Sequence, residues 1–304
     1  MTESTSIIIP PYLRRADKVA LVSPSGAVKD EYVDGGARAL AAMGFAPVVM
    51  PNARGRYGSY SASADDRYTD MAAAILDKDI KAIFCTRGGY GAVQLIDRLS
   101  QLPLRENAKW LVGFSDISAL HALWQSAGVA SILGPMGRYL TQNPSDHPAV
   151  IALKEMLLGT GTPVTAPPHP LNRQGTCTAT LRGGNLAVIS PLQCTPFAAI
   201  RPGSLLVIED INEPIYRIER MLWSLKLQGV LGRLAGLACG DFTNTNADLN
   251  HESAEAMIAA MTAEYDYPVA FGLPVGHIPD NMPLMLGAPA TLTVTADGSS
   301  LLNS

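Results

Sequence analysis

A serine at the end of an apolar run is the residue of this sequence best placed to act as a nucleophile. Ser115 follows the strand-like segment Trp110–Phe114 and precedes a helix-like stretch, Ile117–Gln125. A serine at a strand-to-helix turn is raised above the sheet edge, with backbone N–H groups beside it. The alternative is that Ser115 or Asp116 only caps the following helix. Ile117 occupies the place of the second glycine in the common Gly-x-Ser-x-Gly elbow, so that motif is half present.

A histidine late in the chain is the candidate general base. Of the five histidines, His277 lies in a loop between a glycine and an Ile-Pro pair, after the apolar run Val269–Phe271. This position suits proton transfer, although a solvated surface histidine would fit it as well. His121 lies six residues beyond Ser115 on the same expected helix, which is too far for direct contact. We expect the remaining histidines to be solvated: His147, His169 and His251.

Two adjacent acids end another apolar strand. Glu209 and Asp210 follow the run Ser204–Ile208. Buried carboxylates are costly unless they are paired, so we expect these two side chains to face a cleft or a cation. A carboxylate beside a histidine would fix the tautomer of the ring and stabilise the imidazolium, which is the third role in a hydrolytic triad.

A glycine-rich turn could bind a negative charge. The segment Arg87–Gly91 (Arg-Gly-Gly-Tyr-Gly) follows an expected strand and opens an expected helix. Glycines let the backbone approach a ligand closely and leave N–H groups pointing outward. The segment fits an anion or oxyanion cradle, and it fits a tight turn equally well. The segment matches neither the dinucleotide nor the P-loop motif, so nucleotide-phosphate binding has little support. No pair of histidines has metal-ligand spacing, so we expect no metal.

The elements that would position these residues alternate between strands and helices over the first half of the chain. This alternation predicts the α/β class, with a parallel sheet covered by helices on both faces. Ligands in such sheets bind at the carboxyl ends of the strands, where the turns Ser23–Gly26, Arg87–Gly91 and Gly113–Asp116 would all lie. The expected elements are, in order, Lys18–Ser23, Asp30–Met43, Pro47–Met50, Ala64–Asp77, Ile80–Thr86, Ala92–Leu99, Trp110–Phe114, Ile117–Gln125 and Ala130–Leu133.

The character of the chain changes where prolines cluster, between Pro144 and Pro170. We therefore expect an N-terminal domain over residues 1–145, a linker over 146–176 and a C-terminal domain over 177–304. The linker contains one short helical segment, Ala149–Leu158. The C-terminal domain is mixed and richer in β-structure. Its expected elements are Ala179–Leu181, Asn185–Leu192, Ser204–Ile208, Ile215–Gln228, Leu234–Cys239, His251–Thr262, Val269–Phe271 and Ala290–Thr295.

The composition limits the partners and the compartment. The 304 residues are 47% apolar and 16% charged, and the net charge of −4 comes without a basic stripe, which argues against nucleic acid as a partner. No segment approaches the roughly 18 uninterrupted apolar residues of a spanning helix, so we expect no membrane partner. The first residues lack a basic region and a long apolar core, and we expect no signal peptide. Four cysteines without a Cys-x-x-Cys pair suggest reduced thiols and a cytoplasmic protein.

Taken together, these segments resemble the LD-carboxypeptidase family of serine peptidases, which includes murein-recycling enzymes and the microcin C self-immunity proteins. The resemblance covers most of the chain. It rests on six blocks, which occur in the family's order: Ser23–Gly26, Arg87–Gly91, Gly113–Asp116, Leu181–Leu186, Ile208–Asp210 with Tyr216, Ile218, Glu219 and Arg220, and Gly276-His277 with Asn281.

The resemblance implies a Ser-His-Glu triad on two domains. It implies Ser115 as the nucleophile, His277 as the base and then the acid, and Glu209 as the acid that orients His277. It also implies an oxyanion hole formed by the N–H groups of Gly89 (or Gly88) and of Asp116. The implied fold is a Rossmann-like N-terminal domain and a smaller β-rich C-terminal domain. Family members are commonly homodimers and need neither a metal nor an organic cofactor.

Three functions are compatible with this pattern. The first is an LD-carboxypeptidase that releases the terminal D-alanine of murein tetrapeptide, a small peptide whose carboxylates would be bound by arginines such as Arg87 and Arg182. The second is an amidase that cleaves peptidyl or aminoacyl nucleotides, as immunity proteins do. Stacking on a nucleobase would favour aromatic side chains, and the segment 163–180 contains none. The third is a non-catalytic binding protein on the same scaffold.

Overall fold

The computed structural model describes residues 7–303. The chain divides into two compact units. The N-terminal unit extends to Gly161 and also includes Met282–Gly287, whereas the C-terminal unit comprises Thr162–Asn281 and the chain from Ala288 onward. The expectation of no signal peptide depends in part on residues 1–6, which lie outside the described residues.

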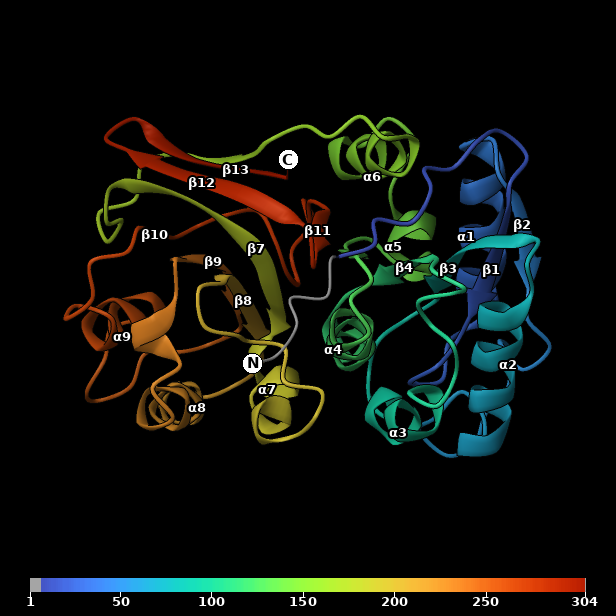
Figure 1. The fold of residues 1–304 in the computed structure, drawn as a ribbon, viewed down its shortest axis with the longest axis horizontal. Coiled ribbons are helices and arrows are strands. Elements are labelled where there is room, and N and C mark those ends of the chain that lie inside the picture. The colour runs from blue at the N-terminus through green and yellow to red at the C-terminus, as the bar shows by residue number, and fades with distance from the viewer. Residues whose placement is uncertain (1–6, 304) are drawn as a thin grey trace. The chain divides into compact units, whose positions relative to one another are not determined.

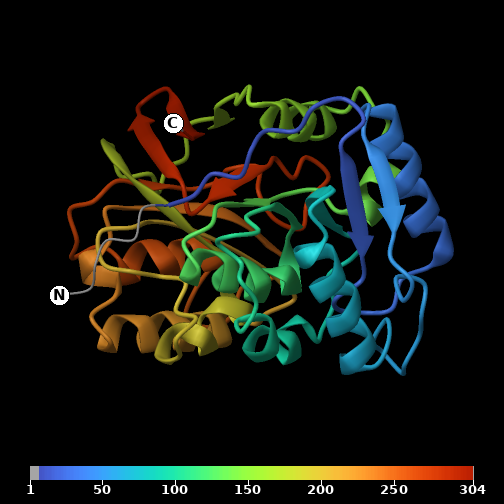
Figure 2. The ribbon, with the colours of Figure 1, turned by 45° about the vertical axis from the view of Figure 1, so that its right-hand side comes forward.

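The N-terminal unit is built on a six-stranded sheet with the order β11-β5-β4-β3-β1-β2. Strands β1 to β5 run parallel to one another, and β11 joins β5 in the antiparallel sense. Helix α1 packs on α5, and α2, α3 and α4 form a second group on the opposite face of the sheet (Figures 1 and 2). The strands are β1 Lys18–Val22, β2 Ala46–Val49, β3 Ile80–Cys85, β4 Trp110–Gly113, β5 Ser131–Leu133 and β11 Leu284–Leu286. The helices are α1 Asp30–Ala42, α2 Ala64–Leu76, α3 Ile96–Leu99, α4 Ser118–Ser126, α5 Gly137–Gln142 and α6 Pro148–Leu158.

The direction of chain travel across this sheet reverses beside β1. The chain passes from β1 outward to β2 and then returns to the other side of β1 for β3. A crevice forms at such a switch point, outside the carboxyl ends of the two neighbouring strands, and ligands of open α/β sheets bind there. The turns after β1 and after β3 therefore occupy the usual ligand-binding position of this kind of sheet.

The C-terminal unit is built on a seven-stranded mixed sheet with the order β10-β9-β8-β7-β12-β13-β6. Strands β7 to β10 pair in parallel, and the other half is antiparallel. Helices α7, α8 and α9 lie along the parallel half (Figure 1). The strands are β6 Val164–Ala166, β7 Gly175–Asn185, β8 Leu205–Ile211, β9 Gly236–Thr243, β10 Val269–Ala270, β12 Pro289–Thr295 and β13 Gly298–Asn303. The helices are α7 Leu186–Ile189, α8 Ile215–Leu227 and α9 Ala254–Met261.

The predicted fold class is confirmed, with a predominantly parallel sheet in one unit and a mixed, β-rich sheet in the other. The segment 146–176 contains α6 in the N-terminal unit and β6 in the C-terminal unit, so it carries more structure than the single short helix we expected. Strand β7 begins at Gly175, four residues before its expected start at Ala179. No helix among residues 7–303 combines the length and the apolar character needed to cross a membrane.

Candidate active site

Ser115 occupies a strained turn at the carboxyl end of β4. The strand ends at Gly113, and a short 3₁₀ turn, Ser115–Ile117, leads into α4. The φ angle of Ser115 is +63°, a left-handed conformation that is uncommon for a residue with a side chain. A β-carbon on Gly113 would lie 2.8 Å from the side chain of Ile117, so only glycine fits where the turn closes over the strand end. Such strain is found at functional sites and at nucleophile elbows, and it separates Ser115 from an ordinary helix cap.

The glycine turn after β3 packs directly against this serine. A β-carbon on Gly88 would lie 2.9 Å from the β-carbon of Ser115 and 3.1 Å from its hydroxyl oxygen. Gly88 is buried, while the next residue, Gly89, is exposed and has a φ angle of +112° that favours glycine. The structure thus brings together two parts of the site that are 27 residues apart in the sequence, Ser115 and the turn containing Gly88.

The side chain of Asp116 joins three loops at this edge of the sheet. One carboxylate oxygen accepts a hydrogen bond from the hydroxyl of Ser25, in the turn after β1, and a second of 2.9 Å from the backbone N–H of Ala92. Asp116 is 6% exposed. From the sequence we expected its side chain at most to cap the following helix and its backbone N–H to line the oxyanion hole. In the structure its carboxylate instead fixes the turns on either side of the serine.

A buried arginine supports the same turns from behind. Arg67, on α2, is 2% exposed and donates hydrogen bonds to the carbonyl oxygens of Pro24 and Gly91, at 2.8 and 2.9 Å. Its guanidinium lies 4.8 Å from the centre of the Tyr60 ring. Burial lowers the pKa of Arg67, with Asp116 among the groups that oppose this effect. No sequence signal marked this residue.

His121 supports the strand end, where both of its ring nitrogens have hydrogen-bond partners. Its side chain is fully buried, and its Nε2 lies 2.8 Å from the carbonyl oxygen of Gly113. Because a carbonyl can only accept, Nε2 carries the proton and Nδ1 accepts from the Ser131 hydroxyl at 2.8 Å. Burial lowers the pKa of His121 to about 4, so the ring is neutral at physiological pH.

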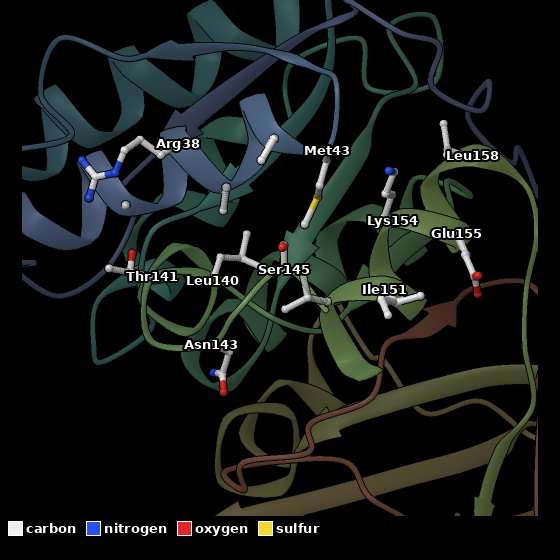
Figure 3. A pocket seen from close by; sticks show the side chains of 14 residues that line it. Arg38, Met43, Leu140, Thr141, Asn143, Ser145, Ile151, Lys154, Glu155 and Leu158 are labelled. Atoms are coloured by element: carbon white, nitrogen blue, oxygen red, sulfur yellow. The ribbon is translucent and has the colours of Figure 1, made fainter. Parts of the chain in front are cut away.

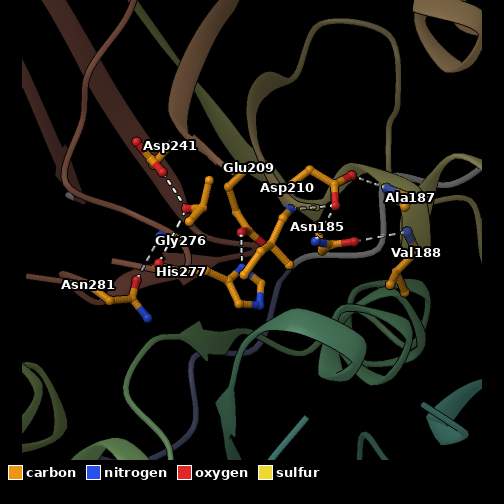
Figure 4. A network of polar contacts seen from close by, with 11 residues as sticks. Asn185, Ala187, Val188, Glu209, Asp210, Asp241, Gly276, His277 and Asn281 are labelled. Atoms are coloured by element: carbon orange, nitrogen blue, oxygen red, sulfur yellow. Dashed lines mark hydrogen bonds and ion pairs between the residues drawn. The ribbon is translucent and has the colours of Figure 1, made fainter. Parts of the chain in front are cut away.

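Glu209 and His277 form a hydrogen-bonded pair in the C-terminal unit. His277 Nδ1 lies 2.7 Å from Glu209 Oε2, and the two side chains point toward one another (Figure 4). The Glu209 side chain is fully buried, whereas that of His277 is 16% exposed. Since a carboxylate accepts, Nδ1 donates and Nε2 is left as the proton acceptor of the ring. This is the orientation that a general base requires.

Two glycines make room for the buried carboxylate. A β-carbon on Gly276 would lie 2.9 Å from Glu209 Oε2, and one on Gly240 would lie 3.3 Å from Glu209 Cβ and 2.4 Å from the carbonyl oxygen of Val275. The loop that carries His277 is held by Asn281, whose Oδ1 accepts a hydrogen bond of 2.9 Å from the N–H of Gly276. Asn281 is fully buried. The sequence placed it only in a motif block, and the structure gives it this positioning contact.

Asp210 points away from the imidazole and has a different set of partners (Figure 4). It is 2% exposed and accepts hydrogen bonds from Asn185 Nδ2 and from the N–H groups of Ala187 and Ile211. Burial raises its pKa to about 6 despite these donors. An irregularity in the pairing of β8 with β9, between Ile208 and Asp210, accompanies the two adjacent acids. For Asp210 the expectation that the acids face a cleft or a cation was wrong, because its carboxylate is buried among an amide and two N–H donors. Glu209 faces the imidazole of His277, and within residues 7–303 its buried Oε1 has no hydrogen-bond partner.

The two arginines that we expected to bind substrate differ in exposure. Arg87 is exposed and donates a 2.6 Å hydrogen bond to the carbonyl oxygen of Ala27. Arg182 lies in β7 and is 8% exposed, and burial lowers its pKa to about 10.

The three histidines that we expected to be solvated, His147, His169 and His251, are half-buried. Two of them, His147 and His169, accept hydrogen bonds from backbone N–H groups two residues further along the chain.

The N-terminal unit also contains a cavity that is separate from these residues. It has a volume of about 540 Å³ and lies between α1 and α6 (Figure 3). Arg38, Lys154 and Glu155 supply the charges of this cavity, and none of the residues predicted to do chemistry lines it.

Within residues 7–303, no group of three or more His, Cys, Asp or Glu side chains is placed to hold a metal ion.

Comparisons with known proteins identify the family of this chain. Residues 19–134 match the family model of the LD-carboxypeptidase N-terminal domain, and residues 178–292 match that of the LD-carboxypeptidase C-terminal domain. The chain is 30% identical over 286 residues to the murein tetrapeptide carboxypeptidase of Pseudomonas aeruginosa. This alignment covers 90% of this chain and 92% of that relative.

Solved structures give the same result. The muramoyltetrapeptide carboxypeptidase from Oxalobacter formigenes superimposes with a TM-score of 0.85 at 26% identity, over 94% of this chain and 99% of that one. The microcin C7 self-immunity protein MccF, in complex with aspartyl sulfamoyl adenosine, has a TM-score of 0.83 at 19% identity over 98% and 99% of the two chains, and thus shares the fold. This chain therefore belongs to the LD-carboxypeptidase family of serine peptidases, and it is an enzyme of the carboxypeptidase type.

Proposed function

We propose that this enzyme is a serine LD-carboxypeptidase that hydrolyses the amide bond before the C-terminal D-alanine of murein tetrapeptide. The observation that carries the proposal is the 2.7 Å hydrogen bond between His277 Nδ1 and the buried Glu209 carboxylate, which leaves Nε2 as a proton acceptor. The strained turn at Ser115 supplies the matching nucleophile. The substrate follows from the relatives that carry murein tetrapeptide carboxypeptidase names.

The proposed reaction follows the acyl-enzyme route. His277 Nε2 takes the proton of the Ser115 hydroxyl as its oxygen attacks the carbonyl carbon, and Glu209 stabilises the imidazolium. The N–H groups of Gly89 (or Gly88) and Asp116 bind the oxyanion. The imidazolium then gives its proton to the nitrogen of the leaving D-alanine, and the C–N bond breaks. Water, activated by the same imidazole, hydrolyses the ester and restores Ser115.

The domain assignment belongs to the same proposal. In functional terms we assign the nucleophile to residues 1–145 and the Glu209–His277 pair to residues 177–304. The segment 146–176 joins them, with its helix α6 in the N-terminal unit and its strand β6 in the C-terminal unit. The enzyme acts as a cytoplasmic homodimer without a metal or an organic cofactor, as the family resemblance implies. Gel filtration with light scattering tests the dimer, and activity retained after dialysis against a chelator tests the absence of a metal.

The direct test is to incubate the purified protein with murein tetrapeptide and to measure free D-alanine. Release of one D-alanine per tetrapeptide by the wild type, and none by Ser115→Ala, is the expected result. A wild type that releases no D-alanine would refute the proposed substrate.

The immunity-protein activity is the alternative with the fold in its favour. The MccF and MccF-like structures share that fold at 18% to 21% identity, which supports the scaffold alone. Competition between tetrapeptide and an aminoacyl sulfamoyl nucleotide separates the two activities. We expect the tetrapeptide to be cleaved and the nucleotide to be spared. The non-catalytic alternative is excluded by membership of an enzyme family.

A further inference from the structure

A basic cavity opens beside the glycine turn of the N-terminal unit. It has a volume of about 530 Å³, which is within the usual size range of small-ligand sites. Its wall comes from the turn after β1, the start of α1, the loop after β2, the turn after β3 and the start of α5. The lining residues are Ala27, Val28, Lys29, Tyr32, Arg54, Gly55, Arg56, Arg87 and Arg138.

The charge of this cavity is opposite to that of the chain. The whole chain carries a net charge of −4, yet the cavity is lined by one lysine and four arginines and by no acid. Two of the cations are neutralised by acids outside the lining, since Lys29 lies 3.4 Å from Glu31 and Arg54 lies 2.6 Å from Asp34. The concentration of positive charge marks the cavity as a site for an anion.

The other three cations have no carboxylate partner within residues 7–303. They are Arg56, Arg87 and Arg138, and all three are exposed. Arg87 donates to the carbonyl oxygen of Ala27, and Arg138 donates to Gln142 Oε1 at 3.3 Å. Guanidinium groups bonded to neutral acceptors keep their full charge and most of their donors for a ligand.

The cavity lies next to the predicted nucleophile. Arg87 immediately precedes Gly88 in the sequence. A β-carbon on Gly88 would lie 2.9 Å from the β-carbon of Ser115. The N–H of Gly26 donates to the carbonyl oxygen of Gly88 at 3.1 Å, and Ala27 then enters the wall of the cavity. Both turns lie at the switch point of the sheet, where ligands of such folds bind. A substrate whose carbonyl carbon is held at Ser115 would therefore extend toward these cations.

We propose that this cavity binds the non-reacting carboxylates of an acidic peptide substrate. The inference rests on the proposed function and adds a determinant of specificity to it. Arginine pairs with carboxylates in a bidentate manner, and such charge-assisted bonds are about twice as strong as neutral ones. Arg56 and Arg138, which lie outside the predicted triad and oxyanion hole, supply the test positions.

The test compares two tetrapeptides that end in the same L–D bond. One has free carboxylates on the residues before that bond, and the other carries the same groups as neutral amides. We expect Arg56→Met and Arg138→Met each to lower kcat/KM for the acidic peptide by about 10-fold, mainly through KM, because each removes one charge-assisted contact. Turnover of the amidated peptide should be the same in both variants as in the wild type. Equal losses on the two peptides, or no loss on either, would overturn the inference.

A control variant and a binding experiment keep the result independent of catalysis. Arg15→Met removes one charge from an exposed site of the same unit, outside the cavity, and should leave both substrates unaffected. Calorimetry on the Ser115→Ala protein should show that the acidic peptide binds about 100-fold more tightly than the amidated one, and that adding Arg138→Met lowers this ratio about 10-fold. If the wild type cleaves neither peptide, the proposed function fails, and this calorimetry still decides the inference.

A nucleotide is the other source of oxyanions. Adenosine monophosphate and inorganic phosphate serve as competing probes in the same calorimetry. Weak binding of both, unaffected by Arg138→Met, is the expected result. Binding of the nucleotide that depends on Arg138, without binding of the acidic peptide, would reassign the cavity to phosphate.

Discussion

Gly88 and Ser115 are so close that a β-carbon on Gly88 would lie 2.9 Å from that of Ser115 and 3.1 Å from its hydroxyl oxygen. The φ angle of Gly88 is not among the positive ones, so alanine can adopt the backbone conformation there. We expect Gly88→Ala to lower kcat/KM by about 100-fold, because a displaced serine loses its alignment with the substrate. Because Ser115 must shift to admit the β-carbon, we also expect a loss of stability of about 1–3 kcal/mol, seen as a lower melting temperature.

The matched control for this substitution is Gly161→Ala. Nothing lies within 4 Å of a β-carbon at Gly161, and its φ angle is also not positive. Activity and melting temperature should both remain at the wild-type level. Full activity of the Gly88→Ala enzyme would show that the glycine turn does not border the reacting serine.

The left-handed conformation of Ser115 predicts that this residue, the proposed nucleophile, reduces the stability of the fold. Its φ angle is +63°, where glycine is free of the strain that any side chain meets. Among inactive variants, Ser115→Gly should therefore have a free energy of unfolding about 1 kcal/mol higher than that of Ser115→Ala. Urea denaturation followed by circular dichroism measures this difference.

A helical serine supplies the control for the sign of this effect. Ser224 is an exposed residue in the interior of α8, where glycine is destabilising relative to alanine by about 0.5–1 kcal/mol. The order of the glycine and alanine variants should therefore be reversed at Ser224. The same order at both positions would mean that Ser115 is not strained.

The buried carboxylate of Glu209 predicts a large effect on turnover from a small change in shape. Glu209→Gln keeps the size of the side chain but replaces the acceptor of His277 Nδ1 with a group that can donate, which favours the wrong tautomer. We expect kcat to fall by about 1,000-fold or more with little change in KM. Glu252→Gln, at an exposed position of the same unit, should have wild-type kinetics.

The neutral state of His121 predicts a loss of stability at acid pH. The pKa of its ring in the folded protein is about 4, below the ordinary value of 6.5. Below pH 6.5 the unfolded chain therefore binds a proton that the folded protein does not, and stability decreases from pH 6.5 down to about pH 4. The full contribution is about 3 kcal/mol, from the 1.36 kcal/mol that each pKa unit represents.

This pH effect is measured as a difference between two proteins. The stability advantage of the wild type over His121→Gln should be greatest above pH 6.5 and should shrink toward pH 4. The comparison cancels the contribution of Asp210, whose pKa, raised to about 6, acts in the opposite direction. A difference that does not vary with pH would mean that His121 is not buried in its neutral form.

The strands that position the site were predictable because they are continuous apolar runs. Four of the five residues of β1 are buried, and so are all four of β4. The turns that follow such strands in a parallel sheet must share one edge, so the proximity of Ser115 to the glycine turn could be anticipated. The short strands β6 and β11 could not, because three residues carry too little pattern and their pairing partners are distant in the sequence.

The contacts that support the site could not be predicted from the sequence either, because the interacting residues are far apart along the chain. The side chain of Asp116 could serve as a helix cap or as a tertiary acceptor, and only the approach of Ser25, 91 residues away, decides between the two. The basic cavity collects its cations from segments that no linear motif connects. The pairing of Glu209 with His277 came from the family resemblance, since each acid and each histidine was ambiguous when considered alone.

The most direct test of the whole account is the rate at which a fluorophosphonate probe modifies Ser115, followed by peptide mapping. The wild type should be labelled at Ser115, Ser115→Ala should not be labelled, and His277→Ala should react about 100-fold or more slowly because the base is missing. His251→Ala, which changes a histidine in the same unit outside the proposed triad, should react at the wild-type rate. Labelling of another serine, or rapid labelling of Ser115 in the His277→Ala protein, would contradict the account.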